Sequence, residues 1–387
     1  MGNDSYAIRP MRKEELPQVR ALMERSFEPY LRPIFFIHPQ STLVAVDGDD
    51  TVVAGINLDI YGVRNGAVKI GYIGWLYTDA PCRGAGLGGR LIDAAIAFLG
   101  EQGCTDVGAC IEGDNPSSFK QLSFRGFSIL PLVGQIKRFG FGLLTVWRHA
   151  SRFFDMGYFF WHKRLDAPDR HGQGMKRETD GSLRPSQKKQ AVAMAGTGLA
   201  CSLLWILALL RKGVAQNLSP LALIALAAFP LALLSWRSLA MRLTAKAEGF
   251  SAMFLPWDTA WLAGILLPVL TGWPFPVPGN WYVAGTGWRL EKERKHLGVM
   301  AVAGVLASLS MTVACKFLAR APIDTVWSGT PVRMLAGLAF QYSATLLVLD
   351  LFFFFYPFCG FNGSRVRRLS LPLWAALTVL SIAIIIA

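Results

Sequence analysis

The stretch Arg83-Gly84-Ala85-Gly86-Leu87-Gly88-Gly89 decides the fold of the first third of the chain. It follows an apolar, strand-like run at 72–77 and precedes an apolar, helix-like run at 91–99. A glycine-rich turn between a strand and a helix brings backbone N–H groups to a helix N-terminus, where the helix dipole favours an anion. Because each glycine in a helix costs roughly 1 kcal/mol relative to alanine, this density of glycines indicates close approach of a ligand.

The flanking sequence extends this pattern over about 130 residues. Further strands are expected at 6–10 and 107–111, a helix at 14–27, and a β-hairpin at 42–56 around the turn at 47–50. Asn115 precedes Gly126-Phe127 by eleven positions.

These features together resemble the GNAT acetyltransferases, whose phosphate-binding signature reads Arg/Gln-x-x-Gly-x-Gly/Ala. The resemblance implies an α+β domain with a mixed central sheet and flanking helices, and acetyl-CoA or another acyl-CoA as co-substrate. It implies that the main chain pairs with the pantetheine arm at Leu76, Tyr77 and Thr78. It also implies a pyrophosphate held by the amides of Gly84, Gly86, Gly88 and Gly89, with charge from Arg83 and with Asn115 in the cofactor-binding set.

The catalytic groups are less regular. Many GNAT enzymes carry a general-acid Tyr seven residues after the Asn, and this chain has Leu122 there. Ser123 and Tyr77 are the candidates to replace this general acid. Glu112 and Asp114, after the fifth strand, are the candidate bases, and their alternative role is a solvated loop in which the Asp caps a helix.

The remainder of the chain has a different character. A mean hydropathy of +0.36 accompanies a net charge of +13, a combination that favours a membrane protein with a basic cytoplasmic face. The first five residues are polar and the acetyltransferase-like domain begins at once. We therefore expect an integral protein of the inner (cytoplasmic) membrane with its acetyltransferase domain in the cytoplasm.

Six apolar runs predict an all-α polytopic membrane domain. They lie at 191–210, 218–236, 250–270, 298–318, 334–356 and 371–387. If the basic clusters are cytoplasmic, the third run dips into the membrane and returns. Those clusters lie at 163–189, 237–246, 289–295 and 365–368, and Arg211, Lys212, Arg320 and Arg333 then face the far side.

The membrane half resembles the site-2 (M50) intramembrane proteases at 239–246, 250–257, 275–283 and 361–366. That family binds zinc through His-Glu-x-x-His and an Asp. Here the corresponding positions are Arg237, Ser238, Met241 and Asn362. The resemblance therefore implies a degenerate, metal-free protease fold, or pseudoprotease, that binds a membrane segment or a lipid or serves as an anchor. Arg237 is expected either to be buried or to snorkel to the interface.

Residues 131–166 are basic and aromatic, which favours contact with an anionic membrane surface over RNA, and 167–190 reads as a linker. The predicted domains are thus 1–130, 131–190 and 191–387. The six cysteines have no paired spacing and predict reduced thiols.

The sequence predicts a membrane-anchored acyl-CoA-dependent N-acetyltransferase. Its expected acceptor is a lipid-linked, membrane-protein or amphiphilic amine, not a nucleic acid. The alternative is a non-catalytic acyl-CoA sensor whose degenerate protease domain binds a membrane protein. The sequence leaves the oligomeric state and the acyl-chain length open.

Overall fold

The computed structural model divides the chain into two compact units. The sheet unit comprises Met1–Phe153 and Phe159–Leu183, and the helical unit comprises Phe154–Tyr158 and Arg184–Ala387. Structure is described for residues 6–153, 155–166, 183–277, 279–285, 287–322, 326–327, 330–353 and 360–387.

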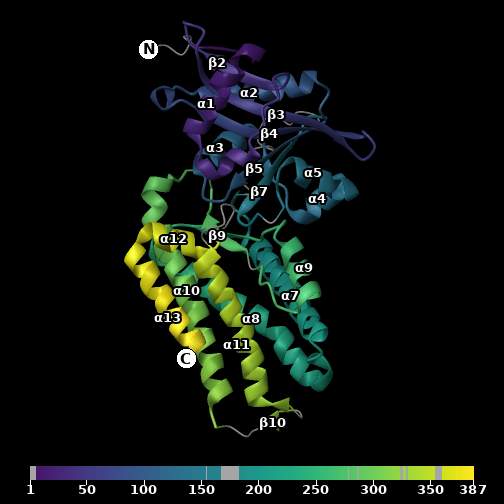
Figure 1. Ribbon diagram of the computed structural model, residues 1–387, viewed down its shortest axis with the longest axis vertical. Helices are drawn as coiled ribbons and strands as arrows, with labels where there is room; N and C mark the ends of the chain where they lie inside the picture. Colours follow the sequence, from purple (N-terminus) through teal and green to yellow (C-terminus); the bar gives the residue numbers. More distant parts are fainter. Residues whose placement is uncertain are drawn as a thin grey trace. The chain divides into compact units, whose positions relative to one another are not determined.

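The sheet unit is built on one seven-stranded mixed sheet of order β1-β2-β3-β4-β5-β7-β6 (Figure 1). Neighbours pair antiparallel from β1 to β4 and between β6 and β7, whereas β4 and β5 run parallel. The strands are β1 (Ala7–Pro10), β2 (Thr42–Val46), β3 (Val52–Val63), β4 (Val68–Thr78), β5 (Asp106–Glu112), β6 (Ser128–Ile129) and β7 (Tyr158–Arg164). The helices are α1 (Leu16–Ser26), α2 (Leu87–Glu101), α3 (Pro116–Ser123), α4 (Leu132–Phe139) and α5 (Leu143–His149), with short 3-10 turns that include η2 (Pro29–Ile34) and η3 (Ala80–Cys82).

Apolar stripes of the helices explain how they cover the sheet. Val19, Leu22 and Met23 of α1 pack in one buried cluster with Tyr77 of β4. Helix α2 buries Leu91, Ile92, Ala95 and Leu99 and packs on β2, β3 and β4. The predicted mixed sheet with flanking helices is confirmed.

The sheet unit extends beyond the predicted boundary at residue 130. Residues 131–166, which we expected to form an interfacial segment, form α4, α5 and the sheet strand β7. The aromatic residues that suggested a membrane surface belong partly to the core, since Phe160 and Trp161 are fully buried and Trp161 lies 4.7 Å from Phe119. Residues 167–182 of the predicted linker lie outside the described residues.

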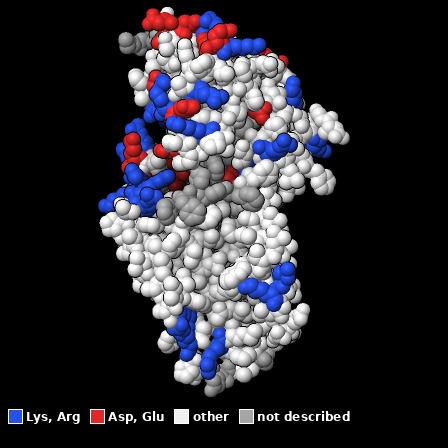
Figure 2. Space-filling view, in the orientation of Figure 1, with Lys and Arg blue, Asp and Glu red and all other residues white. Residues whose placement is uncertain are grey.

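Within its described residues, the helical unit contains four helices that are long and apolar enough to cross a membrane (Figure 1). These are α7 (Gln187–Arg211), α8 (Pro220–Ala247), α10 (Leu290–Arg320) and α11 (Val332–Phe352). Four of the six predicted runs are thereby confirmed as long apolar helices. Helix α8 packs against α7, α10 and α11. On the face drawn in Figure 2 this unit is mostly uncharged, with Lys and Arg confined to small groups.

The other two apolar runs form shorter helices. Helix α9 (Trp261–Thr271) has 11 residues and α13 (Leu371–Ile386) has 16, fewer than the roughly 20 that cross a bilayer at right angles. Helix α12 (Asn362–Leu369) precedes α13, and two small antiparallel ladders, β8 (Ala252–Leu255) with β9 (Asn280–Val283) and β10 (Val326–Trp327) with β11 (Thr330–Pro331), complete the unit.

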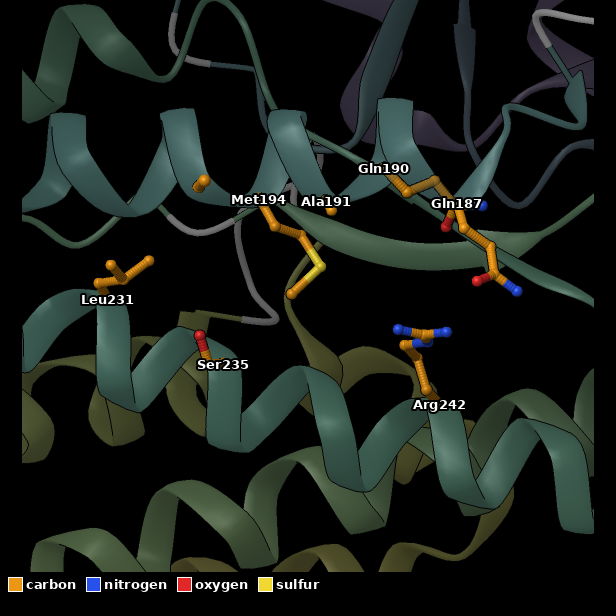
Figure 3. Close-up of a pocket in the computed structure, with 8 residues that line it drawn as sticks. Gln187, Gln190, Ala191, Met194, Leu231, Ser235 and Arg242 are labelled. Atoms are coloured by element: carbon orange, nitrogen blue, oxygen red, sulfur yellow. The ribbon is translucent and has the colours of Figure 1, made fainter.

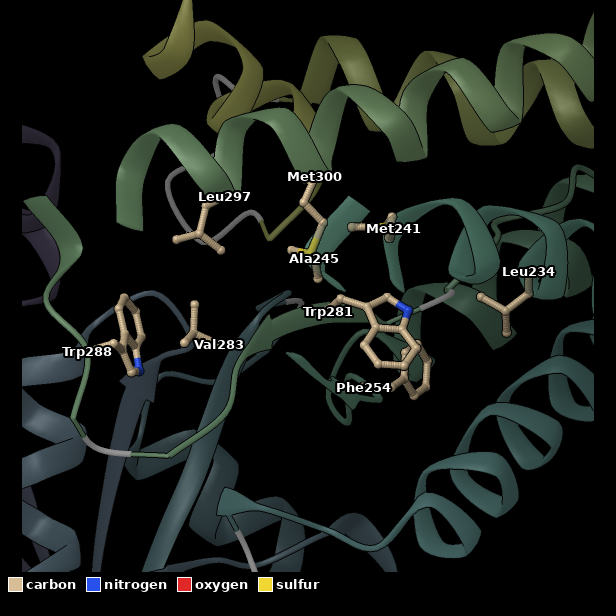
Figure 4. Packing of buried hydrophobic residues seen from close by; sticks show 9 residues of the cluster. All are labelled: Leu234, Met241, Ala245, Phe254, Trp281, Val283, Trp288, Leu297 and Met300. Atoms are coloured by element: carbon tan, nitrogen blue, oxygen red, sulfur yellow. The ribbon is translucent and has the colours of Figure 1, made fainter. Parts of the chain in front are cut away.

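The β8–β9 ladder packs against two of the long helices. Phe254 and Trp281 from the ladder lie in one buried cluster with Met241 of α8 and Met300 of α10, as Figure 4 shows. This cluster fixes the ladder to the helices at one end of the bundle.

Candidate functional site

The glycine-rich turn of the sheet unit adopts a left-handed backbone. Gly84 has φ of +87° and Gly86 has φ of +76°. Gly86 is the N-cap of α2, and it supplies no side chain to cap the helix. A Cβ atom at either position would meet no atom within 4 Å. Glycine is therefore required here by the backbone conformation, and the space beside the turn is open.

The amides of this turn are available to a ligand. Among the described residues, the backbone hydrogen bonds around the turn run from Arg83 to Ala80 and from Arg90 to Gly86, and none uses an N–H between Gly84 and Gly89. The first turn of α2 carries no acidic residue. A run of free N–H groups at the N-terminus of a 15-residue helix is an anion-binding arrangement.

Two of the predicted phosphate-loop residues have additional structural roles. Gly89 is buried, and a Cβ atom there would lie 2.7 Å from the Arg125 guanidinium and 3.1 Å from the Gln121 side chain. Its lack of a side chain thus serves helix packing. Arg83 donates from Nε to the carbonyl oxygen of Thr78 at 3.3 Å and remains exposed, so its charge stays next to the turn.

Strand β4 opens away from β5 beside this turn. The parallel ladder joins Ile70–Ile73 to Asp106–Ala109, and the register with β3 shifts between Asn57 and Leu58, which leaves Gly74 as the extra residue. The β5-facing edge of β4 at Leu76, Tyr77 and Thr78 lies beyond this ladder. Free main-chain groups on a strand edge can pair with an extended amide-bearing ligand.

The side chains of Tyr77, Ser123 and Leu122 belong to the core. The ring of Tyr77 is 3% exposed, and its hydroxyl donates to Asn57 Oδ1 at 3.0 Å. Burial raises the pKa of Tyr77. Ser123 is buried and donates from Oγ to the Lys120 carbonyl at 3.1 Å, and Leu122 is buried beside it. These contacts give Tyr77 and Ser123 structural roles and weaken both as substitutes for the missing acid.

The residues after β5 form a turn and a helix cap. Glu112 ends β5 and Asp114 is buried. Asn115 caps α3, where its Oδ1 accepts from Ser118 N at 3.1 Å. The capping role that we considered for Asp114 thus falls to Asn115, because the helix begins one residue later.

A further polar cluster, formed around Asp59, is brought together by the pairing of the strands. Asp59 of β3 lies opposite Tyr72 of β4, one residue before the β4–β5 ladder ends. Its Oδ2 is 2.6 Å from Nδ1 of His149 on α5, and its Oδ1 is 3.8 Å from Nε2 of His38. Tyr61, two residues further along β3, stacks on His149 with ring centroids 3.9 Å apart.

The sequence signal for this cluster is a polar residue at every second position of an apolar strand. Asn57, Asp59 and Tyr61 share one face of β3 because side chains alternate along a strand. The sequence alone does not predict the cluster, because the two histidines lie far from Asp59 along the chain.

The helical unit holds a second polar group, which is fully buried. Nη2 of Arg237 on α8 lies 3.2 Å from Oδ1 of Asp350 on α11. The backbone N of Asn362 donates to the same carboxylate at 2.8 Å, and Asn280 donates to Asn362 Oδ1 at 3.0 Å. All four residues have exposures of 0%. The structure therefore joins Arg237 and Asn362, which the sequence singled out, through Asp350, which it did not.

The burial of Arg237 decides between the two orientations expected for it. The guanidinium points to Asp350 inside the bundle and does not reach a surface. Ser238 and Met241 are also buried. Among the described residues, no group of three or more His, Cys, Asp or Glu side chains is placed to hold a metal ion.

Comparison with known proteins identifies the sheet unit. Residues 7–127 match the model of the acetyltransferase (GNAT) family. An N-acetyltransferase of this family from Escherichia coli (YhbS), solved with CoA, is 26% identical and covers 32% of this chain and 69% of that chain, with a TM-score of 0.27. Naa50 from Arabidopsis thaliana, solved with the bisubstrate analogue CoA-Ac-MVNAL, is 16% identical and covers 42% of this chain and 99% of that chain, with a TM-score of 0.30.

A chain of the NatC complex bound to Gag peptide and CoA is 19% identical. The match covers 42% of this chain and 99% of that chain, with a TM-score of 0.32. No protein with a curated description matches the chain. The family match spans the turn at Gly84–Gly89 together with its flanking strand and helix, and the sheet unit therefore contains an acetyltransferase domain of the GNAT family.

Proposed function

We propose that the protein is an acyl-CoA-dependent N-acetyltransferase held at a membrane by its helical unit. The observation that carries this proposal is the turn before α2, where left-handed glycines leave free amides facing open space. The pyrophosphate of acyl-CoA would bind these amides with Arg83 nearby, and its pantetheine arm would pair with the free edge of β4 at 76–78.

Acetyl transfer needs a group that accepts the proton of the attacking amine. The amine nitrogen forms a bond to the acetyl carbonyl carbon, the C–S bond breaks, and the departing CoA thiolate takes a proton. The Asp59–His149 pair is our leading candidate for the base, because a carboxylate that orients an imidazole is a common general-base arrangement. Glu112 and Asp114, at the end of β5, remain the alternatives.

The acceptor that we propose is a membrane-borne amine on a lipid, a membrane protein or an amphiphilic small molecule. Support comes from the four helices that are long and apolar enough to cross a membrane. Attachment to the bilayer raises the local concentration of such acceptors.

The test measures acyl-CoA binding to the purified full chain by calorimetry, with donors that range from acetyl-CoA to palmitoyl-CoA. Two matched variants are compared. Gly86→Val and Gly103→Val both place a side chain at a left-handed position, φ of +76° and +73°, with no atom within 4 Å. Both should therefore lose similar stability. Only Gly86→Val should lose CoA affinity, by roughly tenfold or more, because displaced phosphate hydrogen bonds are worth about 1.5–3 kcal/mol each. Equal affinities in the two variants would remove the phosphate-loop assignment.

A second candidate function is a non-catalytic acyl-CoA sensor. The observation that favours it is the burial of Leu122, Tyr77 and Ser123, which leaves no hydroxyl of the expected kind at the acid position. An assay of CoA release with a membrane extract as acceptor separates the two functions. Binding with extract-dependent release supports the transferase, and binding without release under any acceptor supports the sensor.

For the helical unit we propose a metal-free role. Support comes from the residue types Arg237, Ser238, Met241 and Asn362 at the positions that resembled a zinc site. The buried guanidinium of Arg237, held 3.2 Å from Asp350, would also repel a divalent cation. Metal analysis of the purified protein should give no stoichiometric zinc, and a ratio near one zinc per chain would overturn this proposal.

A further inference from the structure

Two adjoining cavities open at one end of the helical unit, where α7 begins and α8 ends. The larger has a volume of about 590 Å³ and the smaller of about 250 Å³. Gln187, Gln190 and Arg242 line both, so the two cavities lie next to each other. A volume of this size is typical of small-molecule binding sites.

The larger cavity is cationic. Its lining includes Arg184, Arg242 and Lys246, and none of its described lining residues is acidic. Within the described part of the chain, Arg242 and Lys246 make no ion pair, and the guanidinium of Arg242 lies over the ring of Trp281 at 5.6 Å. The first turn of α7 borders the same cavity and adds the positive end of its dipole. The cavity is therefore suited to a phosphate group.

The smaller cavity, the slot, is predominantly apolar. It lies between α7 and α8 and is lined by Ala191, Met194 and Ala195 on one side and by Leu231 and Ser235 on the other. Figure 3 shows Met194 and Ser235 pointing into the space between the two helices, with Arg242 at one end and Leu231 at the other. One turn beyond, a Cβ atom on Gly198 would lie 2.5 Å from Leu231, so the helices touch there and close the slot.

We propose that these two adjoining cavities together bind an anionic phospholipid, with the phosphate in the cationic cavity and an acyl chain in the slot. The slot leads away from the cations along two helices that are long and apolar enough to cross a membrane. The acyl chains of a lipid in a bilayer extend away from the headgroup in the same way. The slot ends at the Gly198–Leu231 contact, and its volume of about 250 Å³ leaves no room for a helix. A soluble phosphate compound would use the cationic cavity but leave the apolar slot unfilled.

The first experiment compares lipid binding to the full chain in a neutral detergent by native mass spectrometry. Phosphatidylglycerol should bind more tightly than phosphatidylcholine, and glycerol 3-phosphate at millimolar concentration should displace little of it. Equal binding of the two lipids would overturn the charge recognition. Complete displacement by glycerol 3-phosphate would assign the cavity to a soluble phosphate instead.

The second experiment tests each cavity with matched variants. Arg242→Gln and Lys246→Gln should each weaken phosphatidylglycerol binding by about fivefold, the effect of one cation near a lipid headgroup. Arg320→Gln, which removes an exposed arginine at the end of α10, is the control and should bind as the wild type does. The side chain of Lys246 makes no hydrogen bond within the described structure, and its backbone carbonyl is unchanged by substitution, so its variant should keep the fold even if Arg242→Gln does not.

The slot is tested by Ala195→Trp, which fills it, against Leu199→Trp one turn further along α7. Leu199 is exposed and lies outside the cavity lining. Loss of phosphatidylglycerol binding in Ala195→Trp alone is the expected result. Unchanged binding in Ala195→Trp would overturn the acyl-chain site, and equal loss in Arg242→Gln and Arg320→Gln would overturn the headgroup site. None of these readouts depends on acetyl transfer.

Discussion

At the scale of single residues, some glycines of the acetyltransferase domain set the backbone conformation, whereas certain polar side chains are candidates for proton transfer. Gly84 and Gly86 supply the left-handed turn, whereas Gly89 makes room for Arg125. Asp59 lies 2.6 Å from the imidazole of His149 and across from Tyr72, next to the end of the β4–β5 ladder. In the proposed mechanism Asp59 therefore positions the His149 imidazole, which accepts the proton, and no family motif surrounds Asp59.

We predict that Asp59→Asn lowers kcat for acetyl transfer by roughly a hundredfold, the lower end of general-base effects. The affinity for acetyl-CoA should stay unchanged, because Asp59 lies outside the phosphate turn. Steady-state kinetics and calorimetry on the same sample measure the two quantities. Asp49→Asn, on the exposed turn between β2 and β3, is the control. A drop in CoA affinity that equals the drop in kcat would assign Asp59 a structural role.

At the scale of elements, Asp106 explains why the sheet unit continues past residue 130. Its carboxylate is fully buried at the start of β5 and accepts from Arg138 of α4 at 2.8 Å and from Thr105 at 2.6 Å. His162 of β7 lies 2.7 Å away. Burial alone would raise the pKa of Asp106, but the hydrogen bonds from His162, Arg138 and Thr105 outweigh it and lower the pKa far below its usual range.

The sign of the pH dependence follows from that lowered pKa. The carboxylate is charged in the folded protein well below the pKa of about 3.9 of an unfolded Asp. Its contribution to the free energy of unfolding is thus complete at neutral pH and is lost as the pH falls below about 4. Asp106→Asn should cost about 3 kcal/mol at pH 7, since it leaves Arg138 without its buried partner. Denaturant unfolding of the full chain should show the two proteins converging in acid, and a difference independent of pH would contradict the ion pair.

Local signals made some elements predictable and left others unpredicted. The glycine turn, α2 and the β2–β3 hairpin carry their own periodicity and turn residues, so the sequence predicts them. Strand β7 does not alternate, because Phe159, Phe160, Trp161 and His162 are all buried, and its run of aromatic and basic residues therefore suggested a membrane surface. The role of Asp350 could not be predicted from the local sequence, because its partner Arg237 lies 113 positions away.

The Arg237–Asp350 pair joins α8 to α11 and is expected to behave as a buried ion pair. Removing one partner leaves an uncompensated buried charge, which costs about 3–5 kcal/mol. We therefore predict a large loss of thermal stability in detergent for Arg237→Met and for Asp350→Asn. The double variant, which buries no charge and keeps an acceptor for Asn362, should recover most of that loss. Additive losses in the double variant would show that the two charges are not coupled.

At the scale of the whole molecule, the distribution of charge predicts which ends of the helices face the cytoplasm. Positive residues concentrate where α7 begins, where α8 ends, where α10 begins and along α12. They include Lys188, Lys189, Arg242, Lys246, Arg289, Lys292, Arg294, Lys295, Arg367 and Arg368. The opposite helix ends carry Arg211, Lys212, Arg320 and Arg333. Because cytoplasmic loops are enriched in Lys and Arg, the more basic ends should lie in the cytoplasm, and the proposed use of acyl-CoA would place the acetyltransferase domain there too.

Labelling of single cysteines with a membrane-impermeant maleimide in intact cells tests this orientation. Lys292→Cys and Arg367→Cys should stay unlabelled until the membrane is opened, whereas Lys212→Cys and Arg320→Cys should react from outside. The unsubstituted protein gives the background of the native thiols, of which Cys201 and Cys315 are buried within the helical unit. Labelling of position 292 or 367 from outside would invert the orientation. It would also place the start of α7 outside, because Gln187 there and Lys246 at the end of α8 line one cavity and therefore share one side of the membrane.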